Sequence, residues 1–269
     1  MKRATTSSLL IAAIIFFVAS TPARAQHEGA EVVEEGNGPR LPMPWGLGLT
    51  AYGQRQPYDI VELRVPLAGL DIGAAEDLDI ENNTESFHLK FDYWALPFLN
   101  LFVLGGHIDG TTNVKLSGVD LGLPILLNDL RVEYSGFMYG AGATLAVGGK
   151  SWFATLTYES TWTDLDVTTS DVRGQVLTPT VGLVFGEAAV YVGAMYQKAE
   201  ETHEGIWNMP FLGAVPYYAE LNQSDPWNYH IGMRAGISKH WNLNFKGGFG
   251  KRKSAMAYIG YRFGKPRKL

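Results

Sequence analysis

The sequence contains no cysteine, so disulfide bonds do not stabilise this fold. After the N-terminal segment it also lacks any apolar run of the roughly 20 residues that a membrane-spanning helix requires. A helical membrane protein is therefore excluded. A basic excess is missing too, because 22 Lys and Arg stand against 27 Asp and Glu. This acidic balance argues against nucleic acid as a partner.

Residues 1–25 have the pattern of a secretory signal peptide. Lys2 and Arg3 give a positive start, an apolar segment follows, and the sequence Ala-Arg-Ala ends at Ala25. We expect cleavage between Ala25 and Gln26, since the apolar run is short for an uncleaved anchor helix. Removal of the three cations of this segment changes the net charge from -5 to -8.

The rest of the chain divides into three parts. Residues 26–42 are acidic and contain glycine, which predicts a flexible periplasmic segment. Residues 43–264 form the predicted β domain, and residues 265–269 form a short basic tail.

The last part of this domain, Trp227 to Phe263, alternates apolar residues with polar residues or glycine over three runs of about ten residues. A period of two predicts β-strands, and the short polar links between the runs predict hairpins. The apolar face has two interpretations at this point. It lines the core of a soluble sandwich, or it faces lipid in a barrel whose interior is polar.

The same alternation recurs upstream and predicts about ten strands, with eight to twelve possible. The links between them alternate between short (95–100, 147–151, 186–188 and 238–240) and long (53–85, 109–133, 163–175 and 198–226). Segregation of short and long links is typical of a transmembrane antiparallel up-and-down β-barrel with long external loops. The fold class that we expect is therefore all-β. The expected strands are Trp45–Tyr52, Ser86–Trp94, Leu101–Ile108, Tyr134–Ala146, Trp152–Trp162, Val176–Phe185, Ala189–Gln197 and the three C-terminal runs.

The signal peptide, the strand pattern and the last strand together resemble bacterial outer-membrane β-barrel proteins. In that class the final strand carries apolar residues at every second position before a terminal aromatic, as Ala257, Ile259, Tyr261 and Phe263 do here. The resemblance implies that the barrel-assembly machinery reads these residues, and that the lipid bilayer of the cell outer membrane surrounds the protein. The chain differs from the class in the six residues after Phe263, since the class usually ends on the aromatic.

Charged residues at the alternate, inward positions are the candidate site. Two interpretations stay open for them: a charge-selective or proton-linked lumen, and a salt-bridge network that fills a narrow barrel. The eight residues of this predicted lumen charge network are His88, Lys90, Asp92, Glu159, His230, Arg234, Lys246 and Arg262.

Other chemistry has weaker signals. The acidic residues Glu76, Asp77, Asp79, Glu81 and Glu85 lack the spacing of a calcium loop, so a solvated acidic loop is expected and no metal site is assigned. For an outer-membrane hydrolase the candidate residues are His203, Ser170 and Ser224, which lie in expected loops without a recognisable motif. No catalytic residue and no cofactor is assigned.

Two of the expected loops are unusually apolar, at Val119–Leu127 and Ile206–Tyr218. Such segments need burial, as a plug or strand extension, against a hydrophobic ligand, or against a partner or the outer leaflet. The expected function is a narrow passive pore or a structural or surface-interaction barrel. The alternative is an uptake channel for a small hydrophobic compound, and an outer-membrane enzyme comes third. The sequence does not define the oligomeric state.

The cleavage site is directly testable. We expect the mature protein to begin at Gln26 and to fractionate with outer membranes, because the small residues before Gln26 match the specificity of signal peptidase. N-terminal sequencing of the purified protein measures this, and a chain that begins at Met1 would contradict it.

Overall fold

The computed structural model describes residues 43–64, 79–115, 129–166, 171–209, 213–223 and 225–265. Strands make up nearly all of them. No helix within these ranges is long and apolar enough to cross a membrane. The strands are β1 (Trp45–Arg64), β2 (Asp79–Leu96), β3 (Leu99–Lys115), β4 (Leu130–Gly148), β5 (Trp152–Leu165), β6 (Asp171–Phe185), β7 (Ala188–Met209), β8 (Gly213–Gln223), β9 (Trp227–Gly236), β10 (Trp241–Phe249) and β11 (Lys253–Phe263).

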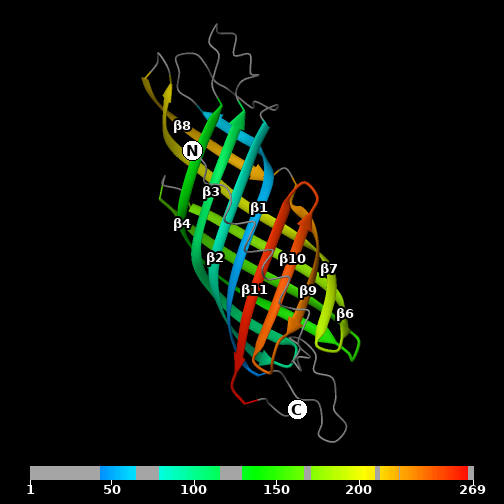
Figure 1. Ribbon diagram of the computed structural model, residues 1–269. Coiled ribbons are helices and arrows are strands. Elements are labelled where there is room, and N and C mark those ends of the chain that lie inside the picture. The colour runs from blue at the N-terminus through cyan, green and yellow to red at the C-terminus, as the bar shows by residue number, and fades with distance from the viewer. Residues whose placement is uncertain are drawn as a thin grey trace, which may run out of the picture.

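Ten of these strands close into a ring (Figure 1). Each pairs antiparallel with its neighbours, and β7 is followed in the ring by β9. The ring closes where β1 meets β11, from Trp45 opposite Phe263 to Arg55 opposite Lys253. The predicted antiparallel barrel of about ten strands is confirmed. β1 begins and β11 ends at the same end of the barrel. Because each strand of the ring runs opposite to the one before it, this arrangement requires an even number of strands.

The eleventh strand, β8, was not predicted. It pairs with the far part of β7, from Glu201 opposite Leu221 to Met209 opposite Gly213. It also pairs with the far part of β1, where Tyr58 is opposite Gln223. The prediction of residues 198–226 as an external loop is therefore wrong, since most of this segment is a hairpin that continues the wall. Of the interpretations of its apolar residues, strand extension is the one that the backbone pairing shows.

The physical reason for β8 lies in the unequal strand lengths. β7 has 22 residues and β1 has 20. The three strands that lie between β7 and β1 in the ring are shorter: β9 has 10 residues, β10 has 9 and β11 has 11. The long strands would present two unpaired edges above the short ones, and an unpaired edge is a site of aggregation. β8 covers both edges. In Figure 1 the tip of the β10–β11 hairpin lies well below the far ends of β2 and β3.

The other long links are also shorter than expected. β1 continues to Arg64 and β2 begins at Asp79, so much of the link 53–85 is strand. The same holds for the links 109–133 and 163–175, of which residues 116–128, including Val119–Leu127, and residues 167–170 lie outside the described residues. The sequence pattern ended each strand where the apolar alternation ended. Backbone pairing continues beyond that point because ladder hydrogen bonds do not require an apolar face.

The outer face of the barrel is apolar. In β2, Phe87, Leu89 and Phe91 expose 59%, 56% and 42% of their surface, whereas Ser86 and Asp92 between them are buried. The exposed large apolar side chains lie on this outer face in the other strands as well, whereas the inner face combines polar residues with apolar ones such as Phe102 and Leu104 of β3. This arrangement is opposite to that of a soluble protein, in which each such side chain would forgo roughly 1.5–3 kcal/mol of burial.

The expected assembly residues lie on this outer face at the closing seam. Phe263 and Tyr261 of β11 are 37% and 36% exposed and stack on each other, with ring centroids 6.2 Å apart. Trp45, opposite Phe263, lies 4.2 Å from the ring of Tyr93. Aromatic residues therefore gather at the end of the barrel where the chain termini of the ring meet. Their recognition by an assembly machinery stays a prediction.

Inside the barrel, aromatic rings lie over glycines of the neighbouring strand. A Cβ added at Gly48 would lie 2.2 Å from the ring of Tyr258, and one at Gly142 would lie 2.4 Å from the ring of Phe102. The pairs Tyr134 with Gly110, Phe153 with Gly182 and Tyr191 with Gly232 repeat the arrangement. The rings lie against the wall because glycine leaves that space, and so they do not fill the lumen.

The face assignment predicts unequal costs for the same substitution. Leu89→Arg places a charge on the apolar outer face, so we expect it to lower the free energy of unfolding in lipid by about 2–4 kcal/mol. Thr157→Arg is the control, because Thr157 faces the cavity, and we expect a smaller loss. Urea unfolding in lipid vesicles measures both. Equal losses would show that the assignment is wrong.

Candidate functional site

A cavity of about 430 Å³ runs inside the barrel. All ten strands of the ring contribute to its wall. At one end it is bordered by Trp94, Asn100 and Glu187, next to the short turns, and at the other by Tyr58 and Leu165. The cavity therefore extends along most of the length of the barrel.

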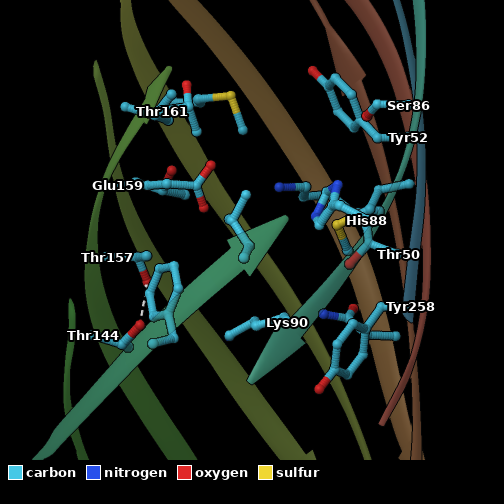
Figure 2. Close-up of a pocket in the computed structure, with 18 of the residues that line it drawn as sticks. Thr50, Tyr52, Ser86, His88, Lys90, Thr144, Thr157, Glu159, Thr161 and Tyr258 are labelled. Atoms are coloured by element: carbon cyan, nitrogen blue, oxygen red, sulfur yellow. Dashed lines mark hydrogen bonds between the residues drawn. The ribbon is translucent and has the colours of Figure 1, made fainter. Parts of the chain in front are cut away.

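Threonine hydroxyls supply much of the polar wall. Thr144 and Thr157 are hydrogen-bonded to each other at 2.9 Å across β4 and β5, as Figure 2 shows. Thr–Thr pairs across strands are a common stabilising contact in sheets. The threonines that line the cavity are Thr50, Thr84, Thr144, Thr155, Thr157, Thr161, Thr163, Thr178 and Thr180. The sequence analysis assigned no role to them, although their period of two placed them on the inner face.

The structure divides the eight residues of the predicted lumen charge network into two groups. The first group lines the cavity, and the second forms an ion pair at the end near the short turns. The cavity group is His88, Lys90, Glu159, His230, Arg234 and Lys246, and the ion pair is Asp92 and Arg262.

In the cavity group, Glu159 faces two lysines. Lys90 and Lys246 both act electrostatically on its carboxylate, but within the described residues no cation lies within 4.0 Å of it. Figure 2 shows Glu159 on one wall and Lys90 reaching into the cavity from the other. Lys90 also lies 4.4 Å from the centre of the Phe102 ring. The three charges therefore face open space and are not consumed in direct ion pairs.

The two histidines lie on different walls. His230 of β9 approaches Thr180 at 3.4 Å through Nε2, and its ring meets Tyr191 edge-on at 6.0 Å. His88 of β2 is separated from β9 by β1, β11 and β10 around the ring. The geometry does not join the two into one proton-transfer pair.

Arg234 and its surroundings form the wall below His230. Its guanidinium lies 3.8 Å from the centre of the Phe153 ring, a cation–π contact. Tyr191 donates a hydrogen bond to Asn244 at 2.6 Å on the same side. Glu187, in the turn before β7, also borders the cavity. The alternation did not reveal Glu187 because a turn residue has no strand parity.

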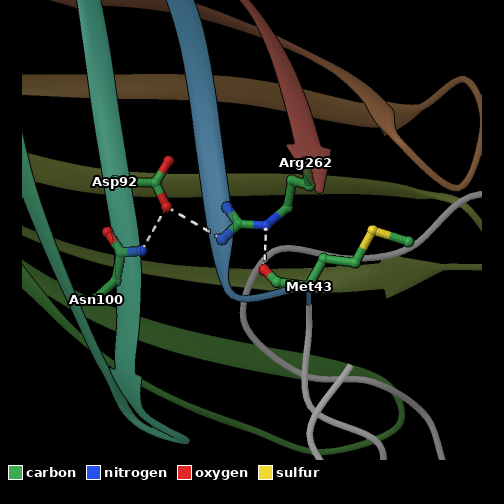
Figure 3. Close-up of polar contacts among 4 residues, drawn as sticks. All are labelled: Met43, Asp92, Asn100 and Arg262. Carbon is green, nitrogen blue, oxygen red and sulfur yellow. Dashed lines mark hydrogen bonds and ion pairs between the residues drawn. The ribbon is translucent and has the colours of Figure 1, made fainter. Parts of the chain in front are cut away.

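The second group lies near the end of the barrel where β1 begins and β11 ends (Figure 3). Arg262 pairs with Asp92 at 3.1 Å and donates to the backbone carbonyl of Met43 at 3.1 Å. Asn100 donates to the other side of the same Asp92 oxygen at 2.6 Å. Both Asp92 and Arg262 are almost fully buried, at 1% and 5% exposure. We call Asp92, Arg262, Asn100 and Met43 the lumen floor.

The weaker candidates are not assembled into a site. His203 lies in β7 opposite Ala219 of β8, and Ser170 and Ser224 lie outside the described residues. The acidic segment is part of strand β2 from Asp79 onward, which corrects its expected loop conformation, and Glu81 forms an ion pair with Arg55. Among the described residues, no three His, Asp or Glu side chains are grouped as metal ligands would be.

The lumen floor gives a stability prediction. Arg262→Met leaves the buried carboxylate of Asp92 without its balancing charge, so we expect a loss of about 3–5 kcal/mol in the free energy of unfolding. The double variant Arg262→Met with Asp92→Leu is the matched control and should recover part of that loss. Urea unfolding measures the coupling, and strictly additive losses would contradict a pair that acts as a unit.

Comparison with models of known protein families and with curated protein sequences finds no match. Solved structures with a similar course of the chain include the transport unit of the autotransporter AIDA-I from Escherichia coli, at 11% identity and a TM-score of 0.41 over 82% of this chain and 90% of that one.

Two further structures are similar at this level. An outer membrane channel from Pseudomonas putida F1 gives 11% identity and a TM-score of 0.39 over 87% of this chain and 100% of that one. The translocator domain of the autotransporter NalP from Neisseria meningitidis gives 12% identity and a TM-score of 0.38 over 81% of this chain and 89% of that one. Similarity of this degree carries no information on function. The closed ring of ten antiparallel strands is itself the architecture of the outer-membrane β-barrels that the sequence pattern resembled.

Proposed function

We propose that the protein is a narrow passive pore of the outer membrane with a preference for small anions. The observation that carries this proposal is the cavity that extends inside the barrel from Asn100 of the lumen floor to Tyr58 and Leu165, lined by threonine hydroxyls, charged side chains and apolar side chains. A barrel with only a structural role has no need of such a cavity, and salt bridges or large side chains would fill it. Here aromatic rings occupy the space beside glycines of the wall, and a cavity remains.

The apolar outer surface supports the proposed location. A band of apolar side chains surrounds the ring, and aromatic residues gather at one end. Lipid is the environment that removes this apolar area from water, and a closed ring satisfies the backbone within lipid. Together with the signal-peptide pattern of residues 1–25, these features support placement in the outer membrane.

The preference for anions rests on the charges that line the cavity. Lys90, Arg234 and Lys246 stand against Glu159 and Glu187, which leaves an excess of one positive charge with both histidines neutral. Rings and clusters of charged side chains set the ion selectivity of pores, because the low-dielectric wall concentrates their field.

A second candidate is passage of a small compound with an apolar part. The inner faces of β3 and β4 supply an apolar strip to the cavity, made of Phe102, Leu104, Ile108 and Met138. This strip shares the cavity with the charged residues, so an amphipathic solute would match both walls.

Conductance across planar lipid bilayers tests the proposed pore. We expect small, single-channel conductance and a reversal potential in a KCl gradient that indicates more chloride than potassium transport. Lys90→Glu with Lys246→Glu changes the lumen charge from an excess of one positive to three negative charges, so we expect the sign of the reversal potential to invert. The control is Lys253→Glu, since Lys253 is exposed on the far end of β11.

Absence of conductance from folded protein would contradict the pore and leave a structural barrel. Conductance whose selectivity is the same in the wild type and in the double lysine variant would contradict the role of the lumen charges.

A further inference from the structure

Three polar side chains are buried together where the short strands end. Arg252, in the turn between β10 and β11, is 1% exposed, Asn228 at the start of β9 is 1% exposed, and Gln56 of β1 is 2% exposed. Arg55 and Lys253 form the last pair of the seam between β1 and β11, so Gln56, which follows Arg55, and Arg252, which precedes Lys253, lie at the same level of the barrel. Asn228 donates to Ser254, two residues after Arg252, at 3.3 Å.

The guanidinium of Arg252 is only partly used by the protein. Its Nη1 donates to Oε1 of Gln197, while Nε and Nη2 have no partner. Nε and Nη2 form one edge of the guanidinium, and this edge is the fork that binds two oxygens of a carboxylate or phosphate. Both amide atoms of Gln56, which is buried at the same level of the barrel, are without a partner as well.

A buried cation of this kind needs an anion. Loss of water is costly for a charge unless an opposite charge and hydrogen bonds replace it. Asp225 acts electrostatically on Arg252, but no carboxylate of the described residues lies within 4.0 Å of the guanidinium. One oxygen of Asp225 instead accepts a hydrogen bond from the backbone of Trp227 at 2.9 Å. Burial lowers the pKa of Arg252, so Asp225 does not compensate for the lost water.

The site borders the lumen. Gln197, which holds Nη1 of Arg252, lines the cavity, as do Tyr52 and Tyr58, whose hydroxyl groups are close enough to act electrostatically on Arg252. It lies at the end of the cavity opposite to the lumen floor. A solute that enters from this end would therefore meet Arg252 before it reaches Glu159 and Lys90.

We propose that Arg252 and Gln56 form a binding site for the oxyanion group, a carboxylate or a phosphate, of a small solute in the lumen. The guanidinium edge binds two oxygens of the solute, and the Gln56 amide donates to one of them. The proposal deepens the proposed pore function and rests on it for the delivery of the solute. Binding itself is measurable without conduction.

Isothermal titration of the detergent-solubilised full barrel tests the site, with sodium acetate and sodium phosphate as probes at constant ionic strength. We expect saturable binding of at least one probe by the wild type, and at least tenfold weaker binding by Arg252→Met. Arg252→Lys keeps the charge but not the fork, so it should also bind at least tenfold more weakly. The control is Arg131→Met, since Arg131 is exposed and pairs with Glu133.

Binding by Arg252→Met equal to that of the wild type would overturn the proposal, and so would the absence of saturable binding by the wild type. If Arg252→Met does not fold, as judged by its mobility before and after heating, Arg252→Lys decides. Binding of acetate alone identifies a carboxylate, and binding of phosphate alone identifies a phosphate group. Folded protein that binds a probe but does not conduct ions would contradict the proposed pore and support the binding site. Folded protein that conducts ions but binds neither probe would support the pore and contradict the binding site.

Discussion

The closing pairing between β1 and β11 is the constraint on which the rest of this structure depends. Eleven residue pairs, from Trp45–Phe263 to Arg55–Lys253, join the first strand to the last. This closure, together with β8 on the far parts of β1 and β7, pairs the edges of the ring, so its backbone groups are satisfied without water. Closure in turn fixes which side chains face inward, because adjacent residues of a strand point to opposite faces. The apolar outer band and the polar lumen are thus two results of one register.

The same register decides how open the interior is. A ten-stranded ring leaves limited space for side chains, and a large ring at an inward position would fill it. Glycines on neighbouring strands, such as Gly48 beneath Tyr258 and Gly142 beneath Phe102, take these rings to the wall. Glycines inside a strand weaken it, but here they leave room for the aromatic rings at the wall and so keep space in the lumen. The charged residues Lys90 and Glu159 face each other across the space that remains.

The sequence predicted the features that follow from the alternation of inward and outward positions along each strand. It did not predict the features that depend on where a residue lies along the barrel axis. Alternation placed Lys90 and Asp92 on the same inner face, but it did not show that Asp92 lies lower and belongs to the lumen floor with Arg262. β8 was missed because its pairing with β1 and β7 follows from the unequal lengths of distant strands. Arg252 was missed because a turn residue has no parity, and its inward direction is set by the last pair of the closing seam.

Each end of the lumen has a buried arginine, and the two arginines differ in their hydrogen-bond and charge partners. At the floor, Arg262 has a carboxylate, and it also holds the carbonyl of Met43, so the segment before β1 is tied to the last strand of the ring. At the other end, Arg252 has a neutral partner in Gln197 and an unused edge. A paired charge is stable without solute, whereas an incompletely paired one is stabilised by an anion that arrives from outside. The floor is thus held by a permanent ion pair that ties Met43 to the ring, and the far end offers an unused guanidinium edge for reversible contact with a solute.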